Sequence, residues 1–278
     1  MKALKTYFTL ISIMAVFLLA ACGGNQAKTS EQKDAAKLPE ESSYTVEHAM
    51  GSTTINGTPK RVVILTNEGT EALLAMGVTP IGAVQSFTGK PWYDHIAAKM
   101  KDVKVVGVES EVNVEAIAAL KPDLIIGNKM RQEKIYDQLK AIAPTVFAET
   151  LRGDWKENFK LYAKALNKVD KGNEILQTYD ARIADIGKKL GDQKNMKVSM
   201  VRFMAGDVRI YHKDTFSGVI LNDLGFARPE SQDVNDFAER NLTKERIHAM
   251  DGDILFYFTY DTGDGNGAAL EKDWINDP

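Results

Sequence analysis

Two arginines interrupt strands that are otherwise apolar in the second half of this chain. Arg202 lies in the run Val198–Phe203, and Arg209 lies in the run Val208–Tyr211. The planar guanidinium group matches the oxygen atoms of a carboxylate or a hydroxamate and remains charged throughout the physiological pH range. We therefore expect both arginines to bind an oxygen-rich anion. A surface salt bridge is the alternative for each of them.

Other polar and aromatic residues follow predicted strands, which is where ligands bind in α/β proteins. Aromatic rings cover the apolar parts of a ligand, and a few charged groups orient it. Thr66, Asn67 and Glu68 follow the first predicted strand, but we do not count them among the predicted ligand-binding residues. Trp92 ranks first among the aromatics, because a turn can hold it toward the ligand. The predicted ligand-binding residues are Trp92, Tyr93, Lys129, Arg131, Arg202, Arg209, Tyr211 and Tyr260. They suit an anionic or metal-chelating small molecule.

Enzyme and metal-binding patterns are missing from the sequence. The histidines His48, His95, His212 and His248 are scattered, without the spacing of a metal site. Cys22 is the only cysteine. The chain has no nucleophile elbow, phosphate loop or dinucleotide fingerprint. We expect no catalytic residues, no metal ligands and no cofactor. The net charge of −3 gives no reason to expect nucleic acid as a partner.

The elements that would position these residues alternate between strand and helix. The runs 62–65, 124–126 and 254–256 are continuously apolar, which is typical of parallel strands buried on both faces. Gly77 and Gly225 follow predicted helices, where a left-handed C-cap favours glycine. The pattern predicts an α/β protein with mostly parallel sheets and helices on both faces.

A weak internal duplication divides the folded part into two lobes. Residues 115–127 (EAIAALKPDLIIG) and 245–257 (ERIHAMDGDILFY) match in order and spacing, including Asp123 with Asp253. Chance similarity is the alternative. We expect two Rossmann-like lobes, at 44–150 and 194–278, with the ligand in a cleft between them.

A helical connector is predicted between the lobes, at 151–193. Apolar and aromatic residues such as Trp155, Phe159 and Tyr179 recur at helical spacing on one face. Gly172 interrupts this pattern, so the connector is either one kinked helix or two helices in series. We expect its aromatic residues to pack against the lobes, and we expect closure between the lobes to be small.

The N-terminus has the pattern of a lipoprotein leader. Lys2 and Lys5 precede an apolar run of 14 residues, Phe8–Ala21, which is shorter than the about 20 residues that span a bilayer. Leu19-Ala20-Ala21-Cys22 matches a bacterial lipobox. We predict a signal peptide at 1–21, lipidation of Cys22 and a flexible tether at 22–43. The protein would then be anchored by lipid at the extracytoplasmic face of the cell membrane.

Four motifs make the chain resemble the substrate-binding lipoproteins of bacterial iron–siderophore ABC importers, which share their fold with vitamin B12-binding proteins. The motifs are Pro59–Val63 (PKRVV), Thr70–Gly82 (TEALLAMGVTPIG), Lys121–Ile126 (KPDLII) with the preceding Glu115-Ala116-Ile117, and Ile142–Thr145 (IAPT). Within this family the chain is most similar to Bacillus-type receptors for hydroxamate–citrate siderophores such as schizokinen.

The resemblance implies a transport function without catalysis. Iron(III) would arrive already wrapped by the siderophore, so the protein itself would need no ligand to iron. A monomeric receptor would deliver the chelate to an ABC permease and its ATPase for iron uptake. Glu71 and Glu230 would dock on permease arginines. Receptors for haem, cobalamin or a catecholate siderophore remain alternatives, as does a lipid-anchored surface enzyme.

The chain departs from this family at its C-terminus. Relatives continue past the position of Pro278 with a further strand and helix. The second lobe is therefore expected to be incomplete, with an uncovered edge or face on its sheet.

Overall fold

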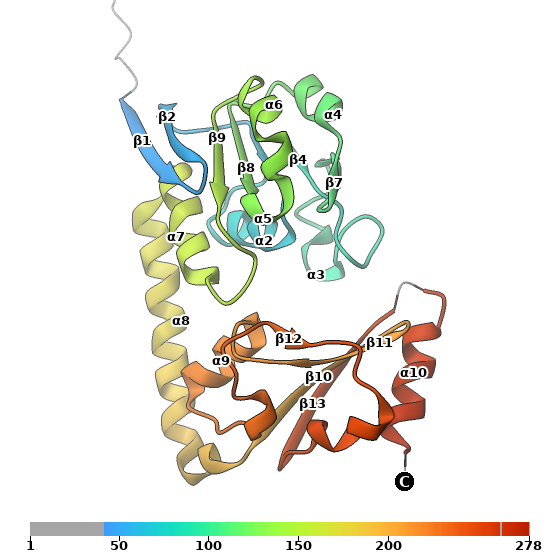
Figure 1. Ribbon diagram of the computed structural model, residues 1–278. Helices are drawn as coiled ribbons and strands as arrows, with labels where there is room; N and C mark the ends of the chain where they lie inside the picture. Colours follow the sequence, from blue (N-terminus) through green and yellow to red (C-terminus); the bar gives the residue numbers. More distant parts are fainter. Residues whose placement is uncertain (1–41, 262, 278) are drawn as a thin grey trace, which may run out of the picture. The chain divides into compact units, whose positions relative to one another are not determined.

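The first sheet carries five parallel strands in the order β5-β4-β3-β8-β9 (Figure 1). The computed structural model of the protein describes residues 42–261 and 263–277. The strands are β3 (Val62–Ile64), β4 (Gly82–Ala83), β5 (Lys104–Val105), β8 (Leu124–Asn128) and β9 (Thr145–Ala148). Every residue of β3, β8 and β9 is buried, which for β3 and β8 is what their continuous apolar runs predict.

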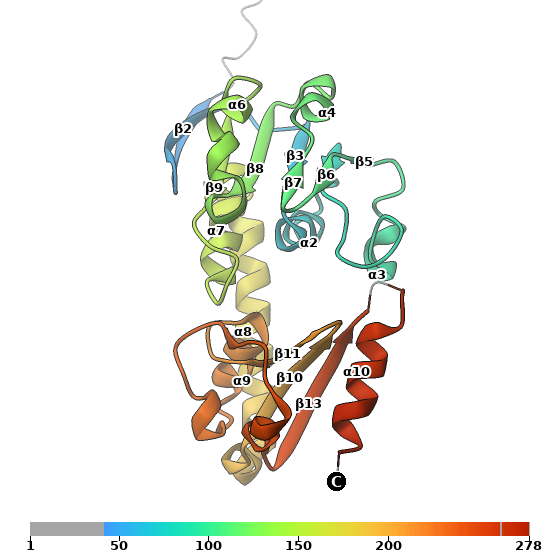
Figure 2. The same ribbon diagram turned by 45° about the vertical axis from the view of Figure 1, so that its right-hand side comes forward.

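Helices cover both faces of this sheet (Figure 2). One face packs against α2 (Asn67–Ala75) and α7 (Trp155–Ala165), and the other packs against α4 (Val114–Ala119) and α6 (Tyr136–Lys140). Shorter elements complete what we call the first lobe, residues 42–165. They are β1 (Ser43–His48), β2 (Gly51–Asn56), α3 (Asp94–Ala97), β6 (Gly107–Val108), β7 (Glu111–Val112), α5 (Lys129–Gln132) and η1 (Glu133–Ile135).

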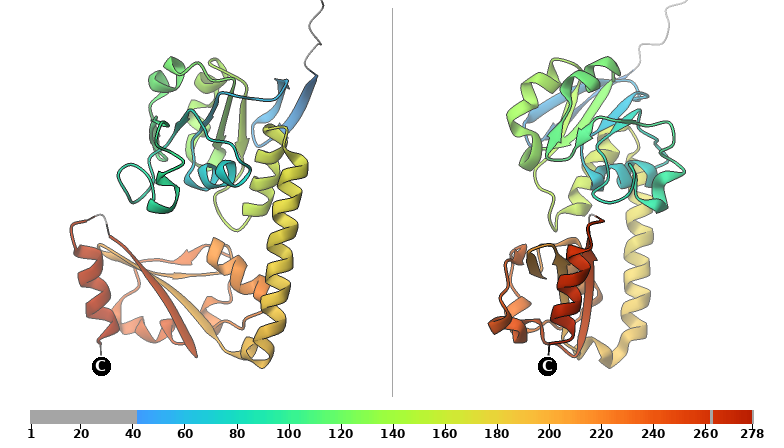
Figure 3. Two further views of the ribbon diagram at one scale, coloured as in Figure 1. Left: turned by 180° about the vertical axis from the view of Figure 1, so that it is seen from behind. Right: turned by 90° about the vertical axis from the view of Figure 1, so that its right-hand side faces the viewer.

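The connector consists of two helices in series. A break at residues 166–168 separates α7 from α8 (Val169–Leu190), the long yellow helix of Figure 3. Asn167 takes φ of 53° in this break. The expected interruption at Gly172 is wrong, because Gly172 lies inside α8. A Cβ at Gly172 would come within 2.6 Å of the Ala163 Cβ, so glycine is needed there for the close approach of α7 and α8.

The second lobe, residues 194–277, has a mixed sheet in the order β12-β11-β10-β13. β10 (Val198–Met204) is parallel to β13 (Ile254–Tyr260) and antiparallel to β11 (Asp207–Tyr211), which pairs with β12 (Ala238–Glu239). Gly206, with φ of 72°, lies in the tight turn between β10 and β11. The short helix η2 (Gly191–Asn195) leads into this lobe. The other helices of the lobe are α9 (Phe216–Leu224), η3 (Glu230–Gln232), η4 (Lys244–Met250) and α10 (Asn266–Ile275). The predicted α/β fold is confirmed.

The two matched aspartates of the duplication have the same structural function. Asp123 precedes β8 and accepts hydrogen bonds from the backbone N–H groups of Lys60 and Arg61, both at 2.8 Å. Asp253 precedes β13 and accepts one from the N–H of Lys197 at 2.7 Å. Each carboxylate thus ties the entry of its strand to the start of the neighbouring parallel strand. The preceding helices differ, because α4 is an α-helix and η4 is a 3₁₀-helix.

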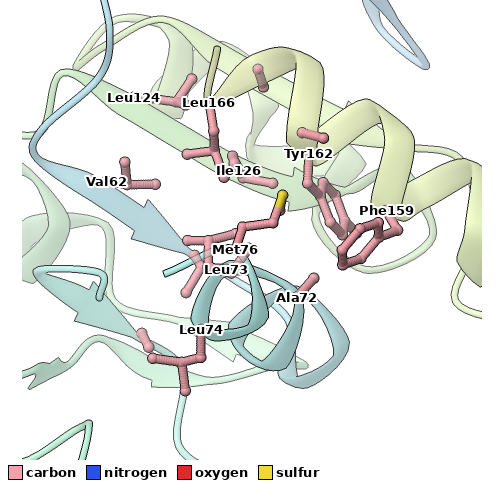
Figure 4. Close-up of a cluster of buried hydrophobic side chains, with 14 of the residues drawn as sticks. Val62, Ala72, Leu73, Leu74, Met76, Leu124, Ile126, Phe159, Tyr162 and Leu166 are labelled. Atoms are coloured by element: carbon pink, nitrogen blue, oxygen red, sulfur yellow. The ribbon is translucent and has the colours of Figure 1, made fainter. Parts of the chain in front are cut away.

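Alternate residues of β3 point into separate apolar cores. Val62 and Ile64 belong to the core that contains Leu73 of α2 and Tyr162 of α7. Figure 4 shows Val62, Leu73 and Tyr162 in this core. Val63 belongs to the core on the other face of the sheet. Because α7 contributes to the first core, the start of the connector is part of the first lobe.

β13 exposes apolar side chains. It is an edge strand among the described residues, and its residues 255–258 are between 36% and 50% exposed. The burial on both faces that the run 254–256 predicted is therefore wrong. No described helix is long and apolar enough to cross a membrane.

The predicted signal peptide, Cys22 and nearly all of the tether lie outside the described residues. β1 begins at Ser43, a residue that the prediction assigned to the tether.

Candidate ligand-binding pocket

A cavity of about 780 Å³ is lined by residues of both lobes and of the connector. The first lobe contributes side chains from α2, α5 and α7, and the connector contributes α8. The second lobe contributes β10, β11, α9 and β13. A volume of this size is typical of sites for small molecules.

Arg202 and Arg209 lie directly opposite each other on β10 and β11, and both line the cavity. Opposed like charges on one face of a sheet are unfavourable unless something compensates them. Arg209 Nε pairs with Asp207 Oδ2. Arg202 donates to the Tyr211 hydroxyl at 3.0 Å, and its guanidinium lies 4.8 Å from the centre of the Tyr260 ring. Among the described residues, Arg202 has no carboxylate partner, so its charge is available to an anionic ligand.

A third arginine, Arg240, lines the same wall with Phe237. Its guanidinium lies 5.6 Å from the centre of the Phe237 ring, and that of Arg152 lies 5.8 Å from it. Arg152 also pairs with Asp214 at 3.2 Å. Within the described part of the chain, Arg240 forms no ion pair with a carboxylate. This wall therefore offers two arginines, Arg202 and Arg240, whose charges are not neutralised by an acidic residue.

Aromatic side chains line the cavity between these charges. The ring of Tyr211 packs edge-on against Phe258, with centroids 5.6 Å apart. Trp155 packs edge-on against Tyr179 at 4.9 Å and against Phe216 at 5.7 Å. Phe216 is 57% exposed, although it is large and apolar. Such rings can cover the apolar parts of a bound molecule.

The first-lobe wall of the cavity carries carboxyl groups. Glu109 is 4% exposed, and it accepts hydrogen bonds from the backbone N–H of Asn67 at 2.9 Å and from Arg131 Nε at 3.3 Å. Glu68 accepts from Asn158 Nδ2 at 3.1 and 3.2 Å. Burial raises the pKa of Glu68 to about 7; the hydrogen bond from Asn158 opposes this shift and the charge of Glu109 adds to it.

The structure brings four of the predicted ligand-binding residues together. Arg131, Arg202, Arg209 and Tyr211 line the cavity. Tyr260 lies beneath Arg202, and its hydroxyl donates to the Phe87 carbonyl at 3.0 Å.

Like Tyr260, the other three predicted residues, Trp92, Tyr93 and Lys129, do not line the cavity. Trp92 is 6% exposed and belongs to the first core, so its expected position toward the ligand is wrong. The turn that carries it closes on itself through the hydrogen bond from Tyr93 N–H to Ser86 Oγ at 3.1 Å. The Tyr93 ring stacks on His95 at 5.6 Å, and Lys129 pairs with Glu149 at 2.9 Å.

Both acids assigned to permease docking are exposed. Glu71 lies on α2 beside the cavity and contacts His95 Nε2 at 2.6 Å. Glu230 begins η3 in the second lobe.

Several cavity residues could not be recognised from sequence patterns, notably Glu109, Arg152, Trp155, Phe237 and Arg240. Phe237 and Arg240 lie in a polar stretch without helical or strand periodicity, so nothing local distinguished them from loop residues. Trp155 was expected to pack, and it does so while also lining the cavity.

No group of three or more His, Cys, Asp or Glu residues within 42–261 and 263–277 could hold a metal ion. The chemistry of the cavity is therefore that of arginine, carboxyl and aromatic groups. It can bind and orient an oxygen-rich molecule.

Known proteins are similar to this chain in sequence and in fold. A family model described as periplasmic binding protein matches residues 62–271. The chain belongs to this family. The binding protein is 53% identical over 273 residues to the probable siderophore-binding lipoprotein YfiY of Bacillus subtilis, covering 96% of this chain and 82% of that relative. The resemblance found in the sequence motifs is thereby confirmed.

Two further known proteins are similar to most of this chain. The Fe(3+)-citrate-binding protein YfmC of Bacillus subtilis is 32% identical over 284 residues, covering 99% of this chain and 86% of that relative. The crystal structure of Staphylococcus aureus SirA complexed with staphyloferrin B superposes with a TM-score of 0.78 at 39% identity, covering 84% of this chain and 83% of the other. The first of these relatives is named as a binding protein, and the second was solved as a complex with a small ligand.

Proposed function

We propose that this protein captures a ferric siderophore of the hydroxamate or citrate type and delivers it to an ABC permease for iron uptake. The observation that carries the proposal is the pair Arg202 and Arg240 in an aromatic-lined cavity of about 780 Å³, since neither arginine has a carboxylate partner among the residues that the structure describes. A ferric chelate of this type presents carboxylate or hydroxamate oxygens on an otherwise apolar framework. Arginine recognises the oxygens and the rings cover the framework.

Iron is the cargo of this site and needs no ligand from the protein. The siderophore would supply the oxygen atoms around iron(III), so the receptor contacts only the outer surface of the chelate. The proposed role is binding and delivery without turnover and without a cofactor. Similarity to proteins described as siderophore-binding and ferric-citrate-binding supports it.

Delivery depends on residues at the surface and at the N-terminus. We place Glu71 and Glu230, one exposed acid on each lobe, at the contact with arginines of the permease. The lipid on Cys22 would keep the receptor at the extracytoplasmic face of the membrane, next to the permease.

Tryptophan fluorescence provides a direct test of ligand binding. Trp155 lines the cavity, whereas Trp92 and Trp274 are each 6% exposed and belong to apolar cores. Titration with ferric schizokinen or ferric citrate should therefore quench the emission, and most of the quenching should disappear in Trp155→Phe. Arg202→Ala should weaken binding about tenfold or more, because a charge-assisted hydrogen bond contributes about 1.5–3 kcal/mol.

Arg182→Ala is the matched control, since Arg182 is an exposed arginine of α8 outside the cavity. It should bind as the wild type does. Binding of haem or free metal in place of ferric siderophores would contradict the proposed function. Unchanged affinity in Arg202→Ala would contradict the assigned pocket.

A further inference from the structure

The two walls of the cavity differ in charge. Among the described residues, the charged side chains with which the second lobe lines it are Arg202, Arg209 and Arg240, without an acid. The first-lobe wall carries Glu68, Glu71 and Glu109, together with Arg131 and Arg152. Of these two arginines, Arg131 pairs with Glu109 and Arg152 pairs with Asp214. An anion that suits the arginine wall would be repelled at the carboxyl wall. A ligand that fills the cavity must therefore present different chemistry to the two sides.

Two of the three carboxyl groups already have partners. Glu109 accepts hydrogen bonds from the backbone and side chain of Asn67 and from Arg131. Glu71 is exposed and contacts His95 at 2.6 Å. Neither carboxyl group depends on a ligand for its hydrogen bonds.

Glu68 is different, because it is partly buried with one neutral donor. Both of its oxygens accept from the same amide nitrogen, Asn158 Nδ2, which is also shared with the Thr150 carbonyl at 2.8 Å. Within the described residues, no lysine, arginine or histidine lies within ion-pair distance of Glu68. The nearby charge of Glu109 raises the cost of ionising it. A carboxyl group in this position has acceptor capacity that the protein itself does not fill.

We infer that Glu68 is a specificity-determining residue that binds an ammonium or amide N–H group of the chelate, while the carboxylate or hydroxamate oxygens of the chelate face Arg202 and Arg240. This inference rests on the proposed function, and it narrows the ligand class. The preferred chelates carry a hydrogen-bond donor at one end and anionic oxygens at the other. Chelates that present carboxylates on every side bind more weakly.

A matched pair of ferric chelates tests this inference on the full-length protein. Both are synthetic citrate-type chelators with the same iron-binding groups; one ends in a free ammonium group, and in the other that amine is acetylated. Affinities are measured by tryptophan quenching at pH 8, where the Glu68 carboxyl is ionised. The variants are Glu68→Gln, which keeps an acceptor without charge, and Glu68→Met, which removes the acceptor. Glu149→Gln is the control, because Glu149 is an exposed acid outside the cavity.

If Glu68 binds ammonium, the wild type and Glu149→Gln prefer the ammonium chelate about tenfold or more, and Glu68→Gln loses this preference. If Glu68 binds an amide N–H, the acetylated chelate binds as well as the ammonium chelate, and Glu68→Met weakens it while Glu68→Gln does not. Either outcome supports the inference. Thermal melting of each variant confirms that it is folded.

Two outcomes overturn the inference. If the wild type binds both chelates and all Glu68 variants keep the affinities of the wild type, Glu68 does not contribute to ligand recognition. The proposed function stands in that case. If the wild type binds neither chelate nor ferric schizokinen or ferric citrate, the proposed function fails, and this inference fails with it. The comparison within the wild type remains informative even if a variant does not fold.

Discussion

At the scale of single residues, the cavity holds charged groups in positions that are unfavourable for the stability of the protein. Arg202 and Arg209 oppose each other across β10 and β11, and Asp207 neutralises one of them. Glu68 keeps a carboxyl group in a partly buried position beside Glu109. Such arrangements cost stability in the empty protein and are compensated when a ligand of opposite charge binds.

The cost of Glu68 should appear as a pH dependence of stability. Its pKa is about 7 in the folded protein, against an ordinary value of 4.5, so the folded state holds the proton more tightly than the unfolded state. The contribution of Glu68 to the free energy of unfolding should therefore fall as the pH rises from 4.5 through 7. The loss should reach about 3 kcal/mol at most, because a tenfold difference in proton affinity between the two states corresponds to about 1.4 kcal/mol.

Urea denaturation of the wild type and Glu68→Gln at pH 4.5, 6 and 8 measures this effect. Asn158, which donates to the carboxyl, has no charge to lose, and the pKa of Tyr162 is raised well above 10, so both stay neutral over this range. Glu109 and Arg131 are common to both proteins. Glu68→Gln should gain stability relative to the wild type as the pH rises. A difference that does not vary with pH would contradict the buried carboxyl, and Glu149→Gln should show no such trend.

At the scale of elements, the connector joins the lobes through close helix contacts. Lys156 of α7 contacts Asp180 of α8 and Asp223 of α9, both at 3.0 Å. Asp223 also accepts from the Tyr179 hydroxyl at 3.3 Å. These contacts join α7, which packs on the first sheet, to α9 of the second lobe. They fit the prediction that closure between the lobes is small, which stays a prediction.

Gly172 should be required for the packing of α7 on α8. In Gly172→Ala the new methyl group would lie 2.6 Å from the Ala163 Cβ, so the helices must separate. Overpacking costs about 1–3 kcal/mol, and the better helix propensity of alanine returns about 1 kcal/mol. We expect a net loss of about 1 kcal/mol in the free energy of unfolding, measured by urea denaturation.

The same helix supplies a control of opposite sign. Gly187 also lies inside α8, and a Cβ there would have its nearest contact at 3.5 Å. Gly187→Ala should therefore stabilise the protein by up to about 1 kcal/mol. Equal effects of the two substitutions would show that packing against Ala163 does not decide the role of Gly172.

At the scale of the whole molecule, the proposed ligand-binding cavity and the predicted lipid anchor belong to separate parts of the chain. The cavity is built from residues between Asn67 and Phe258, whereas the predicted lipobox ends at Cys22. Anchoring should thus contribute to delivery without contributing to affinity.

Cys22→Ala should release the protein from the membrane fraction and leave its affinity for ferric siderophores within error of the wild type. Iron uptake by the cells should fall, because the released receptor is no longer held beside the permease. Fractionation, fluorescence titration and uptake of labelled ferric siderophore measure the three effects. Loss of affinity in the released protein would contradict the separation of the two functions.

Much of the fold could be predicted from short-range patterns. Continuous apolar runs indicated the buried strands β3 and β8, and glycine after a helix indicated left-handed conformations at Gly77 and Gly225, which have φ of 76° and 80°. Arginines inside apolar strands indicated Arg202 and Arg209, which both line the cavity. These features were readable because strand periodicity and capping depend on residues within a few positions of each other.

The sequence by itself thus determined the elements, the family and the arginine-bearing strands. Only the tertiary structure placed Trp92 in a core, and it alone brought Glu68, Phe237 and Arg240 to one cavity. The pairing of Arg152 with Asp214 and the contact of Gly172 with Ala163 likewise join different elements. Local sequence patterns indicate which side chains of a single helix or strand are buried. Which loops and helices meet is decided by packing between elements that are distant in the chain, and the charges that face a ligand follow from that packing.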